Sequence, residues 1–119
     1  MLSRLTVVVL VLFTSYASAE TLQLAHHYKA TGAGPDGSQY TGEVTIDITS
    51  DTTFAISWDI GGTIYKGFGM RRNDVLAASF FSAKSSGLAM YQVQGDGLDG
   101  QWTFKGENGS GTEHLTPVE

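Results

Sequence analysis

The chain contains no cysteine and only two prolines among its 119 residues. Without cysteine it forms no disulfide bond and carries no lipid-modified amino-terminal cysteine, so a small domain must be stabilised by packing and hydrogen bonding alone. Basic residues are also few, with 7 Lys and Arg against 12 Asp and Glu and a formal net charge of −5. Because nucleic-acid phosphates require clustered basic side chains, this charge argues against a nucleic-acid partner.

Long apolar runs are also absent, with one exception near the start. Residues 1–4 carry a positive charge, residues 5–13 are apolar except for Thr6, and Ala17-Ser18-Ala19 has the small-x-small pattern of a signal-peptidase site. A membrane span needs roughly 18 or more apolar residues, and this run is shorter. We therefore predict a signal peptide over residues 1–19, cleaved between Ala19 and Glu20, and a protein that is periplasmic or secreted.

The remaining residues, 20–119, are enough for one domain with a modest core. No second apolar segment follows, so we expect no membrane span in the mature chain. Removal of Arg4 with the signal changes the formal charge from −5 to −6, since all acidic residues lie at or beyond Glu20.

The mature sequence alternates between apolar and polar residues, which is typical of antiparallel strands with one buried and one wet face. The clearest example places Tyr40, Gly42, Val44, Ile46 and Ile48 on the predicted buried face. Glycine, asparagine or serine breaks the pattern about every ten residues, and no interval has helical periodicity. The predicted strands are near residues 22–31, 39–49, 53–60, 63–71, 75–82, 88–94, 98–105 and 110–116.

Turn chemistry predicts that successive strands pair with each other. Residues 34–37 read Gly-Pro-Asp-Gly, which favours a type I turn, and Gly61-Gly62 supplies the positive φ angles of a two-residue hairpin. Eight twisted strands in a row leave two exposed edges unless the sheet closes. The fold class predicted is therefore all-β, a small antiparallel up-and-down barrel of about eight strands.

Glycines recur among the large residues of the predicted inward faces. The pattern is large-x-Gly-x-large or large-x-Gly-x-Gly. It occurs at Gly42, at Gly67 with Gly69, and at Gly100. Glycine at such a position lets a strand bend and lets a neighbouring ring cover the gap, and we favour that interpretation. The alternative is that these glycines make room for a ligand.

Several of these motifs together resemble a known family. They are the Pro-Asp-Gly-Ser-x-Tyr-x-Gly string over residues 35–42, Trp-x-Ile-Gly-Gly over 58–62, and Gly-Thr-Glu-x-Leu-Thr-Pro over 111–117. The chain is similar to a family of small exported proteobacterial β proteins, some of which carry the label of fibronectin-binding protein. The resemblance covers nearly all of the mature chain, implies a fold and a double-membraned bacterium, and supplies no catalytic residue.

Candidate catalytic and metal-binding residues are sparse. His26 and His27 are adjacent, so on a strand they point to opposite faces and do not chelate one ion together. His114 comes near them if the barrel closes, but Glu113 then alternates away from it. No Gly-x-Ser-x-Gly turn is present, and the acidic pair Glu43 and Asp47 shares a wet face. We predict no metal site, no cofactor and no enzymatic activity.

The aromatic residues Tyr40, Trp58, Tyr65, Tyr91 and Trp102 are the most informative side chains. They form either the core of a filled barrel or the walls of a ligand cavity, and short strands favour filling. The leading hypothesis is therefore a non-enzymatic binding or inhibitory module that acts through loops or an edge on an unknown protein partner. A carrier of a small apolar ligand is the first alternative. It requires a cavity of at least about 300 Å³, with small residues such as Ala77, Ala78, Gly67 and Gly69 at its mouth. A surface adhesin is the second.

Overall fold

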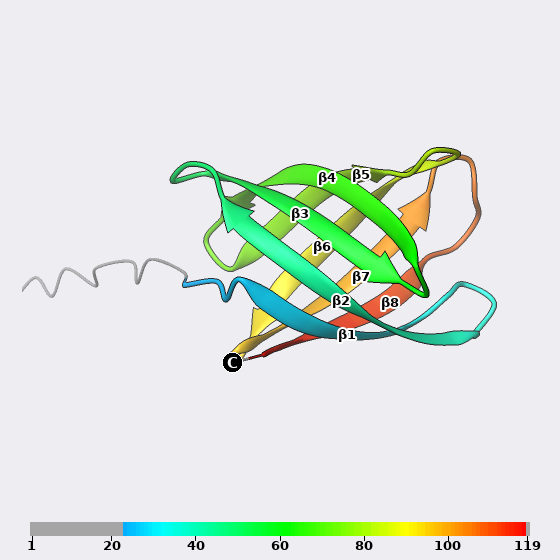
Figure 1. The fold of residues 1–119 in the computed structure, drawn as a ribbon, viewed down its shortest axis with the longest axis horizontal. Coiled ribbons are helices and arrows are strands. Elements are labelled where there is room, and N and C mark those ends of the chain that lie inside the picture. The colour runs from blue at the N-terminus through cyan, green and yellow to red at the C-terminus, as the bar shows by residue number, and fades with distance from the viewer. Residues whose placement is uncertain (1–22, 119) are drawn as a thin grey trace, which may run out of the picture.

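The structure is a computed structural model that describes residues 23–118, and the predicted signal peptide with its cleavage site lies outside them. The described chain forms eight antiparallel strands in a closed barrel (Figure 1), which confirms the predicted fold class. Within residues 23–118 there is no helix that would serve as a membrane span. The strands are β1 (His27–Ala33), β2 (Gln39–Ile48), β3 (Thr53–Ile60), β4 (Thr63–Arg72), β5 (Val75–Phe81), β6 (Ser86–Gln94), β7 (Gly97–Phe104) and β8 (Gly111–Pro117).

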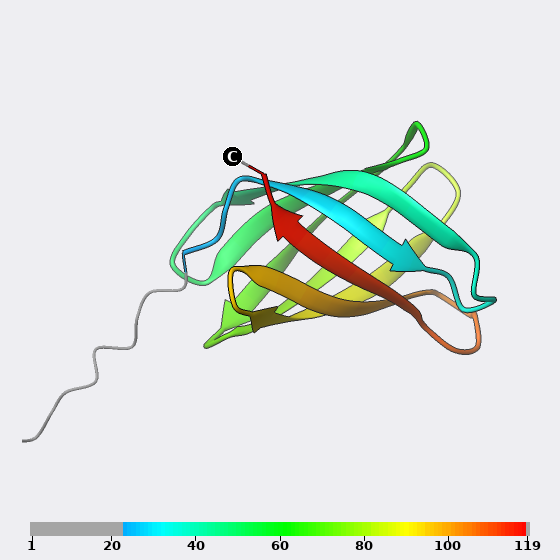
Figure 2. The same ribbon diagram turned by 90° about the horizontal axis from the view of Figure 1, so that it is seen from below.

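The barrel closes because β8 pairs with β1 as well as with β7. Figure 2 shows β8 beside β1, and their register aligns Ala30 with Leu115 and Gly32 with Glu113. Every other strand pairs with its neighbours in sequence, as the tight turns predicted. Closure leaves no free sheet edge, so the predicted action through an edge is wrong for this fold.

The predicted turns form as their residues dictate. The backbone N–H of Gly37 donates to the carbonyl oxygen of Gly34 at 2.9 Å, which closes the turn between β1 and β2. Gly61 and Gly62 have φ angles of 59° and 86°, as a two-residue hairpin of this kind requires. The β1–β2, β3–β4, β5–β6 and β7–β8 connections lie together at one end of the barrel (Figure 1), which we call the loop end.

The first predicted strand, 22–31, is misplaced. Residues 23–26 lie outside any strand, and β1 runs on to Ala33, where the 34–38 turn begins. The N–H of Ala25 donates to the hydroxyl of Tyr28 at 2.8 Å instead of joining a ladder, and Leu24 and Ala25 pack against the core. The other strand limits differ from the prediction by at most two residues.

The core occupies the half of the barrel away from the loop end. Its fully buried side chains come from five strands, and alternation places each of them inward: Phe54, Leu76, Leu98, Leu115 and Val44. In β5, the inward face proves to be that of Leu76, Ala78 and Phe80, while Phe81 faces out. Ile48 was predicted to be buried and is 49% exposed, because it lies at the last position of β2, beside the exposed 49–52 turn.

The inward glycines are covered by neighbouring atoms rather than left open. A Cβ atom on Gly69 would lie 2.6 Å from the ring of Phe54, and one on Gly100 would lie 2.3 Å from the ring of Tyr91. On Gly67 it would meet the backbone of β5. These positions therefore serve the close packing and bending of strands, and the alternative that they make room for a ligand is not supported.

Candidate functional site

The interior of the barrel is not filled at the loop end. A cavity of about 180 Å³ opens there, so the volume of at least about 300 Å³ that we predicted for a carrier of a small apolar ligand is not reached. Ten of its lining residues lie on β2 to β8, and the 34–38 turn contributes two small ones at the mouth. The lining residues are Gly34, Ser38, Tyr40, Trp58, Ile60, Tyr65, Phe80, Ala89, Tyr91, Trp102, Phe104 and Glu113.

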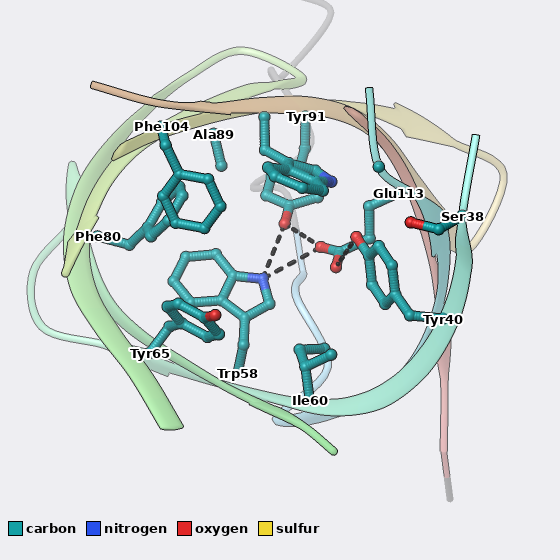
Figure 3. Close-up of a pocket in the computed structure, with 12 residues that line it drawn as sticks. Ser38, Tyr40, Trp58, Ile60, Tyr65, Phe80, Ala89, Tyr91, Phe104 and Glu113 are labelled. Carbon is teal, nitrogen blue, oxygen red and sulfur yellow. Dashed lines mark hydrogen bonds between the residues drawn. The ribbon is translucent and has the colours of Figure 1, made fainter. Parts of the chain in front are cut away.

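Aromatic rings make up most of the cavity wall (Figure 3). They form a nearly continuous belt in which each ring contacts the next at a tilted or edge-to-face angle, the arrangement that aromatic pairs prefer. The centroid distances are 6.1 Å for Tyr40–Trp102, 5.5 Å for Trp102–Phe104, 5.6 Å for Phe80–Phe104, 5.3 Å for Trp58–Phe80 and 5.9 Å for Tyr65–Phe80. The cavity therefore has a preformed apolar wall.

Glu113 closes the gap between the two ends of this belt. It lies on β8 between Gly111 and Leu115, which are both buried, so alternation turns its side chain inward. Only 5% of Glu113 is exposed, and it is the one charged side chain among the described residues that line the cavity. Buried carboxylates are rare unless they are paired, so the burial of Glu113 must be stabilised by its neighbours.

Three donors hold the carboxyl group of Glu113. The hydroxyl of Tyr40 donates to Oε1 at 2.9 Å, and the indole Nε1–H of Trp58 donates to Oε2 at 3.1 Å. The hydroxyl of Tyr91 also donates to Oε2, and it accepts a hydrogen bond from Trp58 Nε1 at 3.0 Å. Figure 3 shows these four side chains converging from β2, β3, β6 and β8 on one side of the cavity.

Burial and hydrogen bonding act in opposite directions on the acidity of this group. Burial raises the pKa of Glu113 above its usual range, and the hydrogen bonds from Tyr91, Tyr40 and Trp58 offset part of that rise. Burial and the nearby Glu113 carboxylate raise the pKa of both Tyr40 and Tyr91. Both phenols therefore remain protonated donors at neutral pH, and Glu113 remains their acceptor.

Trp102 adds an unpaired donor to the site. Its Nε1 is buried and makes no hydrogen bond of normal geometry within residues 23–118, although its interaction with the Tyr40 hydroxyl offsets part of the rise in the pKa of Tyr40. A buried N–H without a partner costs about 1–3 kcal/mol. An acceptor atom on a bound molecule would recover that energy.

The structure places all five predicted aromatic residues, Tyr40, Trp58, Tyr65, Tyr91 and Trp102, along this one cavity. The predicted mouth residues are wrong, because Ala77 is exposed on the outer face, Ala78 belongs to the core, and Gly67 and Gly69 lie outside the lining. The small lining residues are instead Gly34, Ser38 and Ala89.

Glu113 was not predicted as a site residue, although the apolar Leu115 two positions later indicates its inward direction.

The histidines lie on the outside of the barrel. His26 Nδ1 is 2.9 Å from Asp47 Oδ1, and His114 Nδ1 is 2.5 Å from Asp99 Oδ1, with all four side chains about half exposed. His114 therefore faces away from Glu113, as alternation predicted. No group of three metal-ligating side chains occurs in the described part of the chain.

A second surface feature lies on the outer face over β4, β5 and β6. Large apolar side chains from β4 and β6 flank the small outward residues Ala77 and Ser79 of β5, so they form a shallow groove. The flanking side chains are more than half exposed: Phe68 68%, Met70 59%, Leu88 60% and Met90 57%. Contiguous exposed apolar surface of this kind marks interaction sites more often than isolated apolar residues do.

The chain matches no known protein-family model, and no curated protein matches its sequence. It is similar in structure to designed barrels. A redesigned β-barrel, b11L5F_LGL, has a TM-score of 0.71 and 16% identity, covering 81% of this chain and 92% of its own. The redesigned barrel mFAP1, bound to DFHBI, has a TM-score of 0.67 and 16% identity, covering 78% of this chain and 94% of its own. At these identities the likeness establishes the fold alone.

Proposed function

We propose that this protein binds a small, largely apolar molecule of about one ring in the cavity at the loop end. The observation that carries the proposal is a preformed aromatic cavity that contains polar groups: the Glu113 carboxyl group and the unpaired Trp102 N–H. A well-formed apolar pocket with a few convergent polar groups is the usual form of a ligand site. An apolar cavity of about 150 Å³ holds benzene, so one of about 180 Å³ is suited to a single substituted ring.

The binding role extends to a proposal about the context of the protein. We propose that the domain works after export, because residues 1–19 have the pattern of a signal peptide. We also propose binding without catalysis, since the carboxyl group is engaged by three donors rather than placed beside a nucleophile. That the barrel mFAP1 is bound to DFHBI supports the ability of such a fold to hold a small molecule.

Benzyl alcohol is expected to bind in the cavity of the wild-type protein. An Ala89→Leu variant is expected to bind it more weakly. Trp58 and Trp102 are the only tryptophans of the chain and both line the cavity, so their two indole N–H signals in a ¹H–¹⁵N NMR spectrum report on it directly. Both signals should shift on titration with benzyl alcohol. The larger side chain at position 89 should weaken the affinity by about tenfold or more, because it fills space the ring requires.

Ala77→Leu is the matched control, since Ala77 lies on the neighbouring strand and faces outward. This variant should bind benzyl alcohol as the wild type does. Saturable shifts that persist unchanged in Ala89→Leu would place binding elsewhere, and the absence of any shift in the wild type would contradict the proposed function.

The outer groove over β4, β5 and β6 favours a second candidate function, the binding of a protein partner. Its exposed Met70 and Leu88 are expected to be essential to that contact. A protein retained from an envelope extract by the immobilised wild type should be lost with a Met70→Lys, Leu88→Lys double variant, because the charges cannot be desolvated in an apolar interface. Equal retention by the two proteins would exclude the groove as the contact surface.

A further inference from the structure

The charge of the cavity restricts the class of ligand it accepts. No basic side chain lines the cavity, and Glu113 forms no ion pair with any residue in the range 23–118. Nearly complete burial of a carboxylate without a counter-ion costs several kcal/mol. A purely apolar ligand would leave that charge uncompensated.

The hydrogen bonds of Glu113 leave one acceptor position open. A carboxylate offers about four lone-pair positions. Trp58 and Tyr91 both donate to Oε2, whereas Oε1 receives only the Tyr40 hydroxyl. One position on Oε1 is thus without a donor in the part of the chain that is described. The three existing donors also fix the orientation of the carboxylate before any ligand arrives.

The aromatic belt reinforces this preference for positive charge. The faces of tryptophan, tyrosine and phenylalanine rings attract cations electrostatically, and tryptophan does so most strongly. Trp58 and Tyr40 are hydrogen-bonded to Glu113 and also belong to the belt, so rings and carboxylate surround the same space (Figure 3). An anionic ligand would face the carboxylate and the negative faces of these rings.

We propose that the cavity selects a small organic cation, a protonated primary amine carried on one ring or a body of similar size. The ammonium group donates a hydrogen bond to Oε1 of Glu113, and the apolar body lies against Phe80 and Phe104. This inference rests on the proposed function, because it specifies the ligand of the same cavity. The net charge of −5 adds a weaker, long-range attraction for cations.

A set of three ligands of nearly equal size tests the proposal: benzylamine, benzyl alcohol and benzoate. Titrations followed by the Trp58 and Trp102 indole N–H signals should give a Kd for benzylamine at least about tenfold below that for benzyl alcohol, with benzoate the weakest ligand. Equal affinity for benzylamine and benzyl alcohol would overturn the inference and leave the proposed function intact. Failure of all three ligands to bind would overturn both.

Glu113→Gln provides the matched variant. Its amide oxygen can accept from Trp58 and Tyr91, and its NH₂ group can donate to the oxygen of Tyr40, so the cavity keeps its shape and loses its charge. In this variant the preference for benzylamine over benzyl alcohol should disappear, and the dispersion of the Trp58 and Trp102 indole N–H signals checks that the cavity is folded. A preference that survives in Glu113→Gln would refute the role of the carboxylate.

The pH dependence in the wild type gives a test that needs no variant. Benzylamine remains protonated between about pH 4 and pH 8, whereas burial raises the pKa of Glu113 above its usual range, so the charge of Glu113 increases with pH over this interval. The other titratable groups in contact with Glu113, Tyr40 and Tyr91, stay protonated since their pKa values are also raised. The affinity for benzylamine should therefore rise with pH while that for benzyl alcohol stays level. A level profile for benzylamine would contradict the proposal.

Discussion

A Glu113→Leu variant is expected to lose about 3 kcal/mol of the free energy of unfolding, a large share of the 5–15 kcal/mol that such a domain has. Leucine is similar in size and apolar, so little packing is lost. The loss arises because the hydroxyls of Tyr40 and Tyr91 and the indole N–H of Trp58 lose their common acceptor in a buried site, and removal of the buried charge offsets only part of it. Urea denaturation followed by tryptophan fluorescence measures this difference.

A double-mutant cycle identifies the cause of that loss. Tyr40→Phe should destabilise the wild type by about 1 kcal/mol, because it removes a donor to Oε1 of Glu113. In the Glu113→Leu background the same change should cost much less, since the Tyr40 hydroxyl then keeps only its long contact with the carbonyl oxygen of Thr112, at 3.5 Å. Glu113→Gln, which keeps an acceptor for Trp58 and Tyr91, should cost much less than Glu113→Leu. An equal cost of Tyr40→Phe in both backgrounds would show that the two side chains act independently.

The barrel is predictable from the sequence because its determinants are local. Alternation over Tyr40 to Ile46 and from Phe54 to Trp58 places each side chain inside or outside, and Gly61-Gly62 determines a hairpin. Each strand then pairs with the strand before it and the strand after it in sequence. Only β1 and β8 would keep an unpaired edge, and the barrel closes because these two edges pair with each other. Two features are not predictable in this way: the entry to β1, where Ala25 bonds to the hydroxyl of Tyr28, and the exposure of Ile48 at the end of β2.

The site depends on contacts that cross the barrel, and those are not local. The five aromatic residues are identifiable from alternation, but their grouping at one end depends on strand stagger, which sets which inward positions share a layer. Glu113 meets Trp58, 55 positions earlier in the chain, only because inward side chains of β8 and β3 meet inside the barrel, with β1 and β2 between the two strands. A carboxylate on a predicted buried face, next to Leu115, is the signal available in the sequence. The cavity volume depends on how the rings tilt, which no pattern encodes.

Gly67→Ala is expected to lower the free energy of unfolding by about 3 kcal/mol, the upper end of the usual cost of overpacking. A Cβ atom at this position would lie 1.8 Å from the carbonyl oxygen of Ser79 and 2.9 Å from Cα of Phe80. Both contacts are backbone, so no rotamer change relieves them and β4 must separate from β5. Because Gly67 pairs with Phe80, the separation would also displace a ring of the cavity wall and weaken the binding of benzyl alcohol.

Gly34→Ala is the matched control, because the nearest atom to its added Cβ is Oδ1 of the Asp36 side chain at 3.0 Å, and the two exposed hydrogen bonds that this oxygen accepts from Ser38 can be replaced by water if the side chain shifts. It should cost less than about 1 kcal/mol. Chemical denaturation measures the free energy of unfolding of both variants. The added methyl group meets backbone atoms at position 67 and a side-chain atom at position 34. If Gly67→Ala proved as mild as Gly34→Ala, the tight approach of β4 to β5 would not determine the stability of the barrel. The large predicted difference follows from closure itself, since a strand displaced in a closed barrel must move both of its neighbours.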